Sequence, residues 1–406
     1  MNIFLINHYA GSPEMGMEYR PYYLAKEWIN LGHNVTILVA NNSHIRQYNP
    51  ELNSDIIEED IDGIKYIWVN TPKYEGNGIG RIKNMFAFIK KTMYKASYFA
   101  NKYKPDVVIA SSTYPSDNYV AKKISKLSGA KFIYEVHDLW PLSPMELGGM
   151  SKLHPFIVAM QHAESFAYRK ADAVISMLPK TQEHMKSHGL DLKKWHYIPN
   201  GVILDEWNNK AKLNDKTLQQ ISEIKSRFDK IVAYTGTLGL ANALDSLILS
   251  AEIVKDVAII IVGKGPEKEN LQKLIADKNL QNVFILESIN KQEIPSLLQI
   301  FDILYIGLQY QSLFRFGISP NKLIDYMMAA KPIIQAIDAG NNVVKEVGCG
   351  IDIEPENPRA IANAITELIN KPKEKLEKMG QNGHNFVLKN HDYSILAKKF
   401  VNIMQQ

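Results

Sequence analysis

Hydrophobic residues occur along this chain in short runs that are separated by longer amphipathic stretches. The first run is Asn2–Asn7, and the second, Asn34–Ala40, follows an amphipathic stretch near Tyr19–Leu31 that ends at Gly32. Short apolar runs and amphipathic stretches of this length are typical of alternating strands and helices. This alternation predicts a parallel sheet with helices packed on its faces.

The same alternation continues through both halves of the chain. Further strands are predicted at 106–110, 131–136, 173–176, 230–234, 257–262, 283–286, 303–306, 332–335 and 350–353, with helical stretches such as 244–254, 267–278 and 292–299 between the later ones. We therefore predict an α/β protein built from two doubly wound, Rossmann-like domains.

The two predicted domains are expected to join near residues 200–228. Pro199 and Gly201 are turn-forming residues, and the stretch Asn208–Gln220 is polar and charged, as linkers often are. We therefore assign residues 1–200 to an N-terminal acceptor-side domain and 201–390 to a C-terminal domain. The last residues, 391–406, are expected to form a helix that packs back on the N-terminal domain. Ligands of such sheets bind beyond the carboxyl ends of the strands, so the reactive cleft is expected between the domains.

Composition excludes several classes of protein. The 406 residues are 46% hydrophobic and 22% charged, and a net charge of +4 is too small to indicate nucleic-acid binding by itself. A single cysteine, Cys349, rules out a disulfide within the chain and a cysteine zinc site. No stretch approaches the length of a membrane-spanning helix, and the first apolar run is too short for a signal peptide. We expect a cytoplasmic protein.

Two glycine-rich loops follow predicted strands in the second half. They are Gly236–Gly239, which includes Thr237, and Gly263–Pro266, which includes Lys264. A helix that begins after such a loop presents free N–H groups to an anion, and Lys264 adds a point charge. Glycines at these positions are also common in plain turns. Neither loop completes G-x-G-x-x-G, since Lys268 stands at the last position, so a nicotinamide dehydrogenase is disfavoured.

A third element lies in Phe316–Ile334. Pro320 is typical of a helix entry, and Asn321 and Lys322 then fall in the first turn. A cation is unfavourable there unless an anion compensates, so this helix start suits a diphosphate. Asp325, one turn on, can accept two hydrogen bonds from ribose hydroxyls. The alternative is a plain amphipathic helix with solvated ends.

These segments, together with Ile198–Val202, resemble the retaining glycosyltransferases of family four, which have the GT-B fold. The resemblance extends over nearly the whole chain. Gly11–Arg20 and Gly317–Lys322 narrow it to enzymes of bacterial surface polysaccharides (O-antigen or capsule), such as N-acetyl-L-fucosamine transferases. It implies a metal-independent hexosyltransferase that moves a sugar, an N-acetylated 6-deoxyhexosamine in that narrower group, from a UDP-sugar to a lipid-linked or oligosaccharide acceptor.

The chain departs from the family pattern at two places. The family has two glutamates separated by seven residues, and here Asp325 stands at the second position but Gly317 at the first. We expect backbone from Gly317 to Pro320 to replace that glutamate at the donor sugar. The basic pair that usually follows the first glycine loop is also missing, which leaves Lys264 and Lys322 as candidates for the phosphate charge. The candidate donor-binding residues are Gly16, Asn200, Gly236, Thr237, Lys264, Ser319, Pro320, Asn321, Lys322 and Asp325.

The catalytic candidates are His137, Asp138 and Lys322. His137 follows a predicted strand where the family places a histidine near the donor sugar, although a lone histidine at a strand end is often structural. We interpret it as a group that orients the sugar or the acceptor by hydrogen bonding. Asp138 then fixes its tautomer or receives the acceptor proton.

The loop near the N-terminus supplies three more candidates. Gly16 has no side chain to block close approach, so its backbone can meet the diphosphate. Glu18 and Arg20 either face the acceptor or hold the loop. Departure of the diphosphate is expected to be stabilised by helix N-termini and lysines, with retention by front-face attack.

The segment Arg81–Lys104 contains seven Lys/Arg and no acidic residue, with apolar and aromatic residues interleaved. A basic amphipathic helix of this kind favours an anionic membrane surface, so we expect peripheral attachment at the inner face of the plasma membrane. The alternative is a basic surface helix packed on its own domain. No nucleic-acid recognition motif is found, and no nucleic-acid partner is expected.

No cofactor and no catalytic metal are expected. Asp60-Ile61-Asp62 has the spacing of a metal-binding pair, but it lies in an acidic, turn-like stretch and is better interpreted as solvated surface. No His/Cys cluster suggests zinc. Two other functions stay open: a UDP-sugar 2-epimerase of similar fold, for which we assign no carboxylates that could move a proton, and a non-catalytic membrane-surface binding protein, which the phosphate loops argue against.

Overall fold

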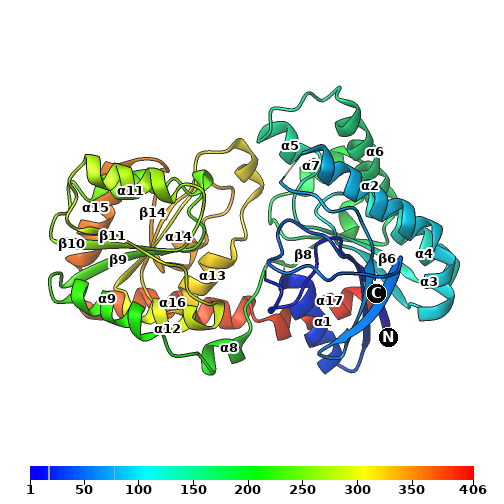
Figure 1. The fold of residues 1–406 in the computed structure, drawn as a ribbon, viewed down its shortest axis with the longest axis horizontal. Helices are drawn as coiled ribbons and strands as arrows, with labels where there is room; N and C mark the ends of the chain where they lie inside the picture. Colours follow the sequence, from blue (N-terminus) through cyan, green and yellow to red (C-terminus); the bar gives the residue numbers. More distant parts are fainter. Residues whose placement is uncertain (17–18, 77) are drawn as a thin grey trace. The chain divides into compact units, whose positions relative to one another are not determined.

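The computed structural model describes residues 1–16, 19–76 and 78–406 (Figure 1). The chain divides into two compact units. Unit 1 consists of Met1–Asn200 and Tyr393–Gln406, and unit 2 of Gly201–Asp392. Each unit is built around its own sheet, and the predicted α/β class with two Rossmann-like sheets of parallel strands is confirmed.

The sheet of unit 1 has eight strands in the order β3-β4-β2-β1-β5-β6-β7-β8. The strands are β1 (Asn2–Ile6), β2 (Asn34–Ala40), β3 (Ile56–Ile61), β4 (Ile64–Val69), β5 (Val107–Ala110), β6 (Lys131–Val136), β7 (Ala173–Ser176) and β8 (Trp195–Tyr197). Neighbouring strands run parallel except β3 and β4, which are antiparallel. The sequence pattern did not predict β3, β4 or β8.

The hairpin of β3 and β4 shows why these strands were missed. Glu58, Glu59 and Asp60 are exposed in β3, which is an edge strand, so the apolar pattern of a buried strand is absent. Asp62 and Gly63 form the turn with φ of 56° and 82°, the left-handed values that a two-residue hairpin loop requires. Asp60 and Asp62 are exposed, in agreement with the surface interpretation.

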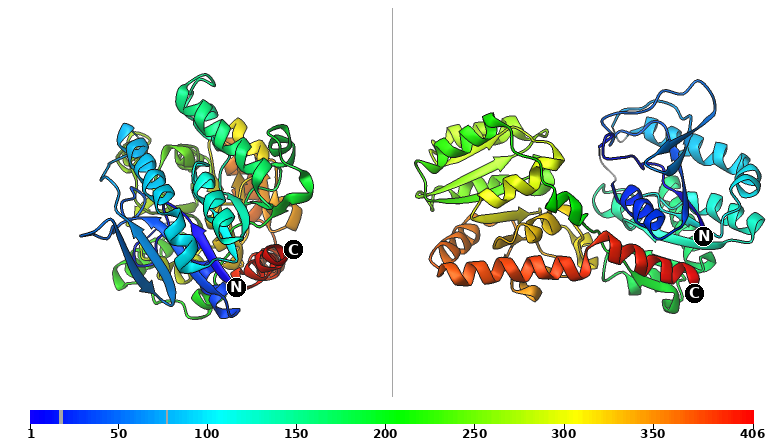
Figure 2. Two further views of the ribbon diagram at one scale, coloured as in Figure 1. Left: turned by 90° about the vertical axis from the view of Figure 1, so that its right-hand side faces the viewer. Right: turned by 90° about the horizontal axis from the view of Figure 1, so that it is seen from below.

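The helices of unit 1 are α1 (Tyr19–Asn30), α2 (Ile79–Tyr94), α3 (Ala96–Tyr103), α4 (Asp117–Ser128), α5 (Leu142–Glu146), α6 (Pro155–Lys170), α7 (Gln182–Ser187), a 3₁₀ turn at Leu192–Lys194, and α17 (Tyr393–Gln405). Helix α17 packs along α1 (Figures 1 and 2). The rings of Trp28 and Phe400 are both fully buried and lie 5.0 Å apart. This aromatic contact ties the last helix of the chain to the first.

The sheet of unit 2 has six parallel strands in the order β11-β10-β9-β12-β13-β14. They are β9 (Lys230–Thr235), β10 (Val257–Val262), β11 (Val283–Leu286), β12 (Ile303–Gly307), β13 (Ile333–Ala336) and β14 (Gly350–Ile353). The helices are α8 (Leu204–Asn208), α9 (Asp215–Lys225), α10 (Leu244–Ser250), α11 (Lys268–Asp277), α12 (Ile294–Ile300), α13 (Asn321–Met328), α14 (Val343–Val347), α15 (Pro358–Ile369) and α16 (Lys373–Asn390), with 3₁₀ turns at Leu240–Asn242, Lys291–Glu293 and Ser312–Phe316.

The interpretation of Asn208–Gln220 as linker is wrong. The whole stretch lies within unit 2, where α9 buries Ile221 and Ile224 in the core. The Asn214 side chain caps α9 by accepting a hydrogen bond from Thr217 N–H at 3.0 Å. The polar residues from Asp215 to Gln220 belong to the first turns of this amphipathic helix, and those between Asn208 and Asn214 lie in the loop that follows α8.

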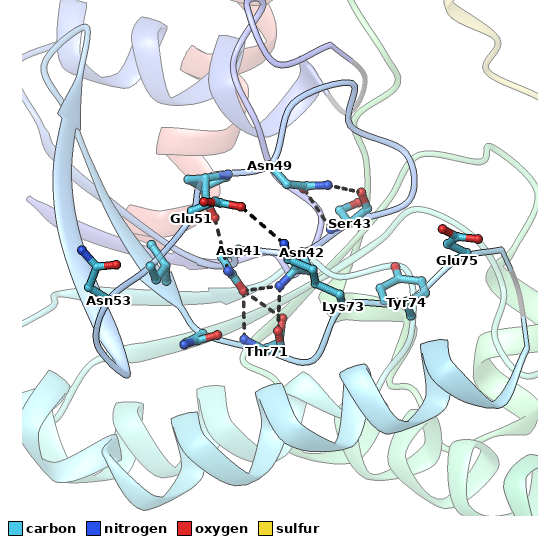
Figure 3. Close-up of a pocket in the computed structure, with 13 residues that line it drawn as sticks. Asn41, Asn42, Ser43, Asn49, Glu51, Asn53, Thr71, Lys73, Tyr74 and Glu75 are labelled. Carbon is cyan, nitrogen blue, oxygen red and sulfur yellow. Dashed lines mark hydrogen bonds and ion pairs between the residues drawn. The ribbon is translucent and has the colours of Figure 1, made fainter.

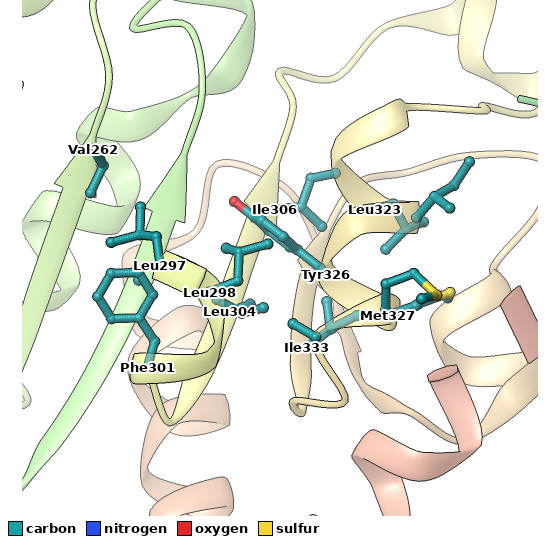
Figure 4. Close-up of a cluster of buried hydrophobic side chains, with 14 of the residues drawn as sticks. Val262, Leu297, Leu298, Phe301, Leu304, Ile306, Leu323, Tyr326, Met327 and Ile333 are labelled. Carbon is teal, nitrogen blue, oxygen red and sulfur yellow. The ribbon is translucent and has the colours of Figure 1, made fainter. Parts of the chain in front are cut away.

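One face of the unit 2 sheet is covered by a large apolar cluster in which α12 and α13 pack on β12 and its neighbours (Figure 4). The buried side chains labelled there are Val262, Leu297, Leu298, Phe301, Leu304, Ile306, Leu323, Tyr326, Met327 and Ile333. Tyr326 also carries a polar tip, and its hydroxyl accepts a hydrogen bond from Thr235 N–H at 2.8 Å. Helix α13 is therefore fixed to the carboxyl end of β9.

In each sheet the chain adds strands first on one side of its first strand, which lies in the middle of the sheet, and then reverses to the other side. In unit 1, β1 lies between β2 and β5, and in unit 2, β9 lies between β10 and β12. Ligands of doubly wound sheets bind at the carboxyl ends of the strands beside such a reversal. Functional residues are therefore expected directly after β1, β5 and β6 in unit 1, and directly after β9 and β12 in unit 2.

Candidate functional site

The two glycine loops of unit 2 pack against each other. Gly236 N–H donates to Val262 O at 2.9 Å, and Leu238 N–H donates to Lys264 O at 2.9 Å. A Cβ atom at Gly263 would lie 1.8 Å from Gly236 O, so no side chain fits there. The second loop therefore needs its glycine for backbone packing, as in the plain-turn alternative. The Lys264 side chain is exposed.

Lys322 lies beside the first glycine loop. Helix α13 begins at Asn321 with Pro320 as its N-cap, as predicted. The Lys322 ammonium is 3.8 Å from the centre of the Tyr234 ring and 3.3 Å from Asn242 Oδ1. Among the described residues, no carboxylate pairs with it. Burial lowers the pKa of Lys322 to about 7.

The loop around Gly236 is held by side chains on both sides. Tyr234 donates its hydroxyl to Thr237 O at 2.7 Å, and Asn242 Nδ2 donates to the same oxygen at 3.1 Å. Gly236 has a φ of 141°, and a Cβ atom there would lie 3.0 Å from Lys322 Nζ. This φ favours glycine, and a side chain at position 236 would also have to displace the lysine head group.

Asp325 lies one turn after Lys322 on α13 and is half-buried. Burial, together with the nearby Glu206, raises the pKa of Asp325 to about 7. Lys291 and a hydrogen bond from Trp207 oppose this shift, but Lys291 is engaged by Glu206 at 2.9 Å. A carboxyl group with this pKa is only partly ionised at neutral pH and gains from new hydrogen-bond donors.

The segment before α13 is held in place by Asn341. Ile318 N–H donates to Asn341 Oδ1 at 2.7 Å, and Asn341 Nδ2 donates to Ile318 O at 3.1 Å. Gly317, with a φ of 93°, donates its N–H to Phe314 O at 2.8 Å. The N–H groups of Gly317 and Ile318 are thus used within the protein. In the same segment Ser319 is half-buried and Asn321 is exposed.

In unit 1, His137 stands directly after β6. Its Nε2 lies 2.9 Å from Ser111 Oγ and 3.3 Å from Glu135 Oε2, and Ser111 Oγ donates to the same carboxylate oxygen at 2.6 Å. Ser111 directly follows β5 and accepts a hydrogen bond at its carbonyl from the Asn7 side chain at 2.7 Å. The ends of β1, β5 and β6 therefore carry one connected polar network.

Glu135 is buried and paired with Arg20. Arg20 Nε donates to Glu135 Oε1 at 3.0 Å, and the guanidinium also donates to the carbonyls of Ile198 and Pro199. Burial alone would raise the pKa of Glu135, but Arg20 and His137 outweigh it and lower the value to about 2. Arg20 is itself 4% exposed. These contacts fit the alternative in which Arg20 holds the loop, while a contact of Arg20 with the acceptor stays a prediction.

The other candidates of unit 1 are placed as follows. Asp138 is exposed, and the carboxylate bonded to His137 Nε2 is Glu135. Gly16 has a φ of 69°, which favours glycine, and Asn200 is buried at the end of the unit. Glu18 lies outside the described residues. Sequence reasoning missed Glu135, although an acidic residue within an otherwise apolar strand is a visible signal.

The basic segment Arg81–Lys104 is not one helix, which corrects the prediction. Helix α2 ends at Tyr94, and α3 begins at Ala96 after a break at Lys95. The buried apolar side chains Met85, Phe88 and Phe99 belong to the core. Exposed on α2 are Ile79, Ile82, Lys83, Phe86, Lys90 and Tyr94.

Part of the positive charge of this segment is neutralised within unit 1. Lys91 pairs with Asp55 at 2.7 Å, and Lys102 pairs with Glu58. Lys83 and Lys90 remain exposed beside Phe86, which is 68% exposed. Across residues 1–16, 19–76 and 78–406, no helix combines the length and the apolar character needed to cross a membrane.

A pocket of about 820 Å³ opens at the carboxyl ends of β2 and β4 (Figure 3). Asn41 follows β2 and accepts from Thr71 N–H at 2.8 Å, while Asn42 donates to Thr71 O at 2.6 Å. Asn49 and Ser43 hold each other across the same loop. These amides fix the loop backbone, and the lining of the pocket is polar.

Comparison with protein families matches both halves of the chain. Residues 15–206 match the family described as Glycosyltransferase Family 4. Residues 215–386 match the family described as Glycosyl transferases group 1. The first range contains His137 and its network, and the second contains Lys322 and Asp325.

Two curated relatives show the level of similarity. The α-D-kanosaminyltransferase of Streptomyces kanamyceticus is 23% identical over 270 residues, which cover 64% of this chain and 66% of that protein. WcaI of Escherichia coli (strain K12), a glycosyl transferase provisionally assigned to colanic acid biosynthesis, is 22% identical over 294 residues, which cover 70% of this chain and 68% of that protein. The chain thus spans about two thirds of the length of these relatives.

Solved structures match the whole chain. Sucrose-phosphate synthase from Thermosynechococcus elongatus has a TM-score of 0.73 at 14% identity, covering 100% of this chain and 99% of that one. Anabaena Alr3699/HepE in complex with UDP and glucose has a TM-score of 0.68 at 16% identity, covering 100% of both chains. At these identities the likeness shows the fold alone, and it agrees with the predicted GT-B type.

Proposed function

Because this chain is a glycosyltransferase, with a Family 4 domain followed by a group 1 domain, we propose that its donor is a UDP-sugar. In this proposal the sugar is transferred with retention to a hydroxyl of a lipid-linked or oligosaccharide acceptor, in bacterial surface polysaccharide synthesis. The structure of Anabaena HepE contains UDP, which supports the choice of nucleotide. The name of WcaI, which refers to colanic acid biosynthesis, supports the choice of product.

The observation that carries the proposal is the position of Lys322. A lysine in the first turn of a helix opposes the helix dipole, and burial removes the water that would stabilise its charge. Its neighbours are the neutral Asn242 amide and the Tyr234 ring. An anion bound against the Gly236 loop offsets both costs. A diphosphate is the group of a nucleotide sugar that fits this requirement.

We propose that the other donor-binding residues of unit 2 act together with Lys322. In our proposal Asp325 accepts hydrogen bonds from the ribose hydroxyls, and the backbone at Gly236 and Thr237 approaches the phosphates. Ser319, Pro320 and Asn321 contribute the exposed end of α13, and Lys264 adds positive charge from its exposed position. Gly16 and Asn200 are the donor-binding candidates that lie in unit 1.

Unit 1 supplies the group that orients the reacting sugar or the acceptor. We assign this role to His137, whose ring is held by Ser111 and Glu135. Asp138, which is exposed, can take the proton that leaves the acceptor hydroxyl. The diphosphate leaves by front-face substitution with its charge stabilised by Lys322, and the reaction proceeds without a metal ion.

The donor sugar and the site of action are further parts of the proposal. The resemblance to N-acetyl-L-fucosamine transferases favours an N-acetylated 6-deoxyhexosamine, and the kanosaminyltransferase relative is named for an amino sugar. The exposed basic and apolar face of α2 favours reversible attachment to an anionic membrane, where a lipid-linked acceptor is found.

The test is calorimetric titration of the full chain with UDP in the presence of EDTA. We expect binding of UDP by wild type, and a strong loss in Lys322→Ala but not in Lys273→Ala, which removes an exposed lysine from α11 and none of the proposed donor-binding residues. Equal affinity in all three proteins would overturn the role of Lys322. With a UDP-sugar, UDP should be released only when an acceptor is added, whereas an epimerase would change the sugar without acceptor.

A further inference from the structure

A buried glutamate and two histidines gather on neighbouring helices of unit 1. Glu164 lies on α6, His184 lies on α7, and His188 follows the last residue of α7 (Figure 1). One potential ligand atom from each residue lies within 4.8 Å of the other two. The spacing of four residues places both imidazoles on the same side of α7, and their ring centres are 4.4 Å apart.

The sequence analysis did not find this cluster. His184 and His188 are visible as a pair, but two histidines alone are common on helices, and Glu164 lies on the preceding helix, with strand β7 between the two helices. Only the packing of α6 beside α7 brings the carboxylate to the imidazoles. The expectation that no His/Cys cluster suggests zinc is therefore incomplete.

The distance between the Glu164 carboxylate and the His184 imidazole can be compared with that of a hydrogen bond and with that of two metal ligands. His184 Nε2 and Glu164 Oε1 are 3.5 Å apart, which is longer than the usual about 2.7–2.9 Å of a charge-assisted hydrogen bond. Two ligands of one tetrahedral Zn²⁺, with bonds of about 2.0–2.1 Å, lie about 3.4 Å from each other. The pair therefore has the separation of two metal ligands.

The potential ligands also make the outer hydrogen bonds that are typical of metal ligands in proteins. His188 Nδ1 lies 2.8 Å from His184 O, so it carries the proton and leaves the Nε2 lone pair for a ligand. Tyr168 donates its hydroxyl to Glu164 Oε1 at 2.9 Å, and Gln161 Nε2 donates to Oε2 at 2.7 Å. These hydrogen bonds orient the imidazole and the carboxylate before any ion arrives.

We propose that Glu164, His184 and His188 form a zinc-binding site that joins α6 to α7. Two imidazoles and one carboxylate suit Zn²⁺ and its first-row neighbours, whereas Ca²⁺ and Mg²⁺ prefer sites built from oxygen atoms alone. Three protein ligands leave a fourth position for water. None of these residues is among those assigned to donor binding or transfer, so the ion stabilises unit 1 and this inference is independent of the proposed function.

The experiment is a titration of the chelator-treated full chain with ZnCl₂ against a competing dye. We expect one Zn²⁺ per chain and a higher melting temperature with zinc. His188→Gln should lower the affinity at least about 100-fold, because loss of a ligand exceeds the about 10–100-fold effect of losing a hydrogen-bond partner of a ligand. The matched control is His162→Gln, which removes an exposed histidine from α6 and should change nothing.

Cobalt provides a second measurement that needs no variant. Co²⁺ bound by two imidazoles and a carboxylate should give visible absorption bands of tetrahedral intensity, and Zn²⁺ should remove them. If His184→Gln and His188→Gln take up as much metal as wild type, the proposal is overturned. The same holds if micromolar Zn²⁺ does not bind, since Glu164 and His184 then form only an ion pair.

Discussion

The two polar centres of this glycosyltransferase, around Glu135 in unit 1 and around Lys322 in unit 2, differ in whether their buried charges are paired. In unit 1, the Glu135 carboxylate is buried but paired with Arg20, and its pKa falls to about 2. In unit 2, no ion pair with Lys322 or Asp325 is found among the described residues, and burial moves the pKa of each to about 7. The charge of Glu135 is balanced by a residue of the protein itself, whereas burial disfavours the charged forms of Lys322 and Asp325.

This difference indicates how each centre works. A buried pair with all hydrogen bonds made is rigid, so the network around Glu135 can hold the His137 ring in one orientation. Groups that lose charge on burial recover it when a ligand of opposite charge or new donors arrive. Lys322 and Asp325 therefore gain most from a nucleotide that brings both phosphates and ribose hydroxyls.

The largest effect is expected from breaking the paired centre. Arg20→Met leaves Glu135 buried without its partner, and the loss should lower the free energy of unfolding by about 3–5 kcal/mol. The measurement is urea unfolding followed by circular dichroism. Because replacement of both charges by apolar groups removes the unpaired carboxylate, Arg20→Met/Glu135→Leu should recover part of the loss. A double variant no more stable than the single one would contradict the pairing argument.

The next effect concerns the group that this centre orients. His137→Ala should lower the rate of sugar transfer by about 10²–10³-fold, the usual effect of removing one preorganised hydrogen-bond donor. UDP affinity and melting temperature should stay near wild type, as measured by calorimetry and by a thermal scan. The control is His162→Ala, an exposed histidine of the same unit. A strongly lowered melting temperature in His137→Ala would show instead that the histidine is structural.

In unit 2 the expected effect is smaller and falls on binding. Asp325→Asn keeps the size of the side chain but removes the charge that accepts ribose hydroxyls, so UDP should bind about 1.5–3 kcal/mol more weakly. Uridine, which lacks phosphate, should lose a similar amount. Asp277→Asn, an exposed carboxylate on α11, serves as control. Unchanged UDP affinity in Asp325→Asn would refute the ribose assignment.

The two displaced pKa values also predict a pH profile for UDP affinity. Lys322 loses its charge as the pH rises through about 7, so binding takes up a proton and should weaken up to about tenfold per pH unit above 7. Asp325 becomes protonated as the pH falls below about 7, which weakens its contact with ribose hydroxyls. Affinity should therefore be greatest near pH 7.

Two variants separate the two limbs of this profile. Lys322→Arg stays charged and should flatten the alkaline limb, while Asp325→Asn should flatten the acid limb down to about pH 6, where the phosphate itself begins to protonate. Calorimetry between pH 6 and 9 measures both. An affinity that is constant over this range in wild type would show that neither group titrates against the nucleotide.

The sequence predicted those features of the fold that depend on the residues within one short segment. Apolar runs located the buried parallel strands, and Pro320 located the start of α13, because burial and proline geometry act locally. The edge strand β3 was missed because its exposed face is acidic. The partners of Arg20 were not predictable, since Glu135 and Pro199 lie more than a hundred residues away and meet it only in the folded sheet.

The smallest effect concerns two exposed lysines on α2 of unit 1. Lys83 and Lys90 flank Phe86, whereas Lys91 is paired with Asp55 and contributes less. Basic residues near an anionic membrane contribute about 1 kcal/mol each, so Lys83→Glu/Lys90→Glu should weaken attachment to vesicles that contain anionic lipid. Salt should weaken attachment of the wild type, because it screens the same charges.

Vesicle sedimentation measures this attachment, and the control must match the change in net charge. Lys375→Glu/Lys378→Glu alters two exposed lysines on α16 of unit 2 by the same amount. If α2 is the contact, only the first pair of substitutions lowers sedimentation, and Phe86→Ser lowers it further by removing an exposed ring that can insert among the lipids. If both pairs act alike, attraction depends on net charge alone. If wild type does not sediment with anionic vesicles, α2 is an ordinary surface helix.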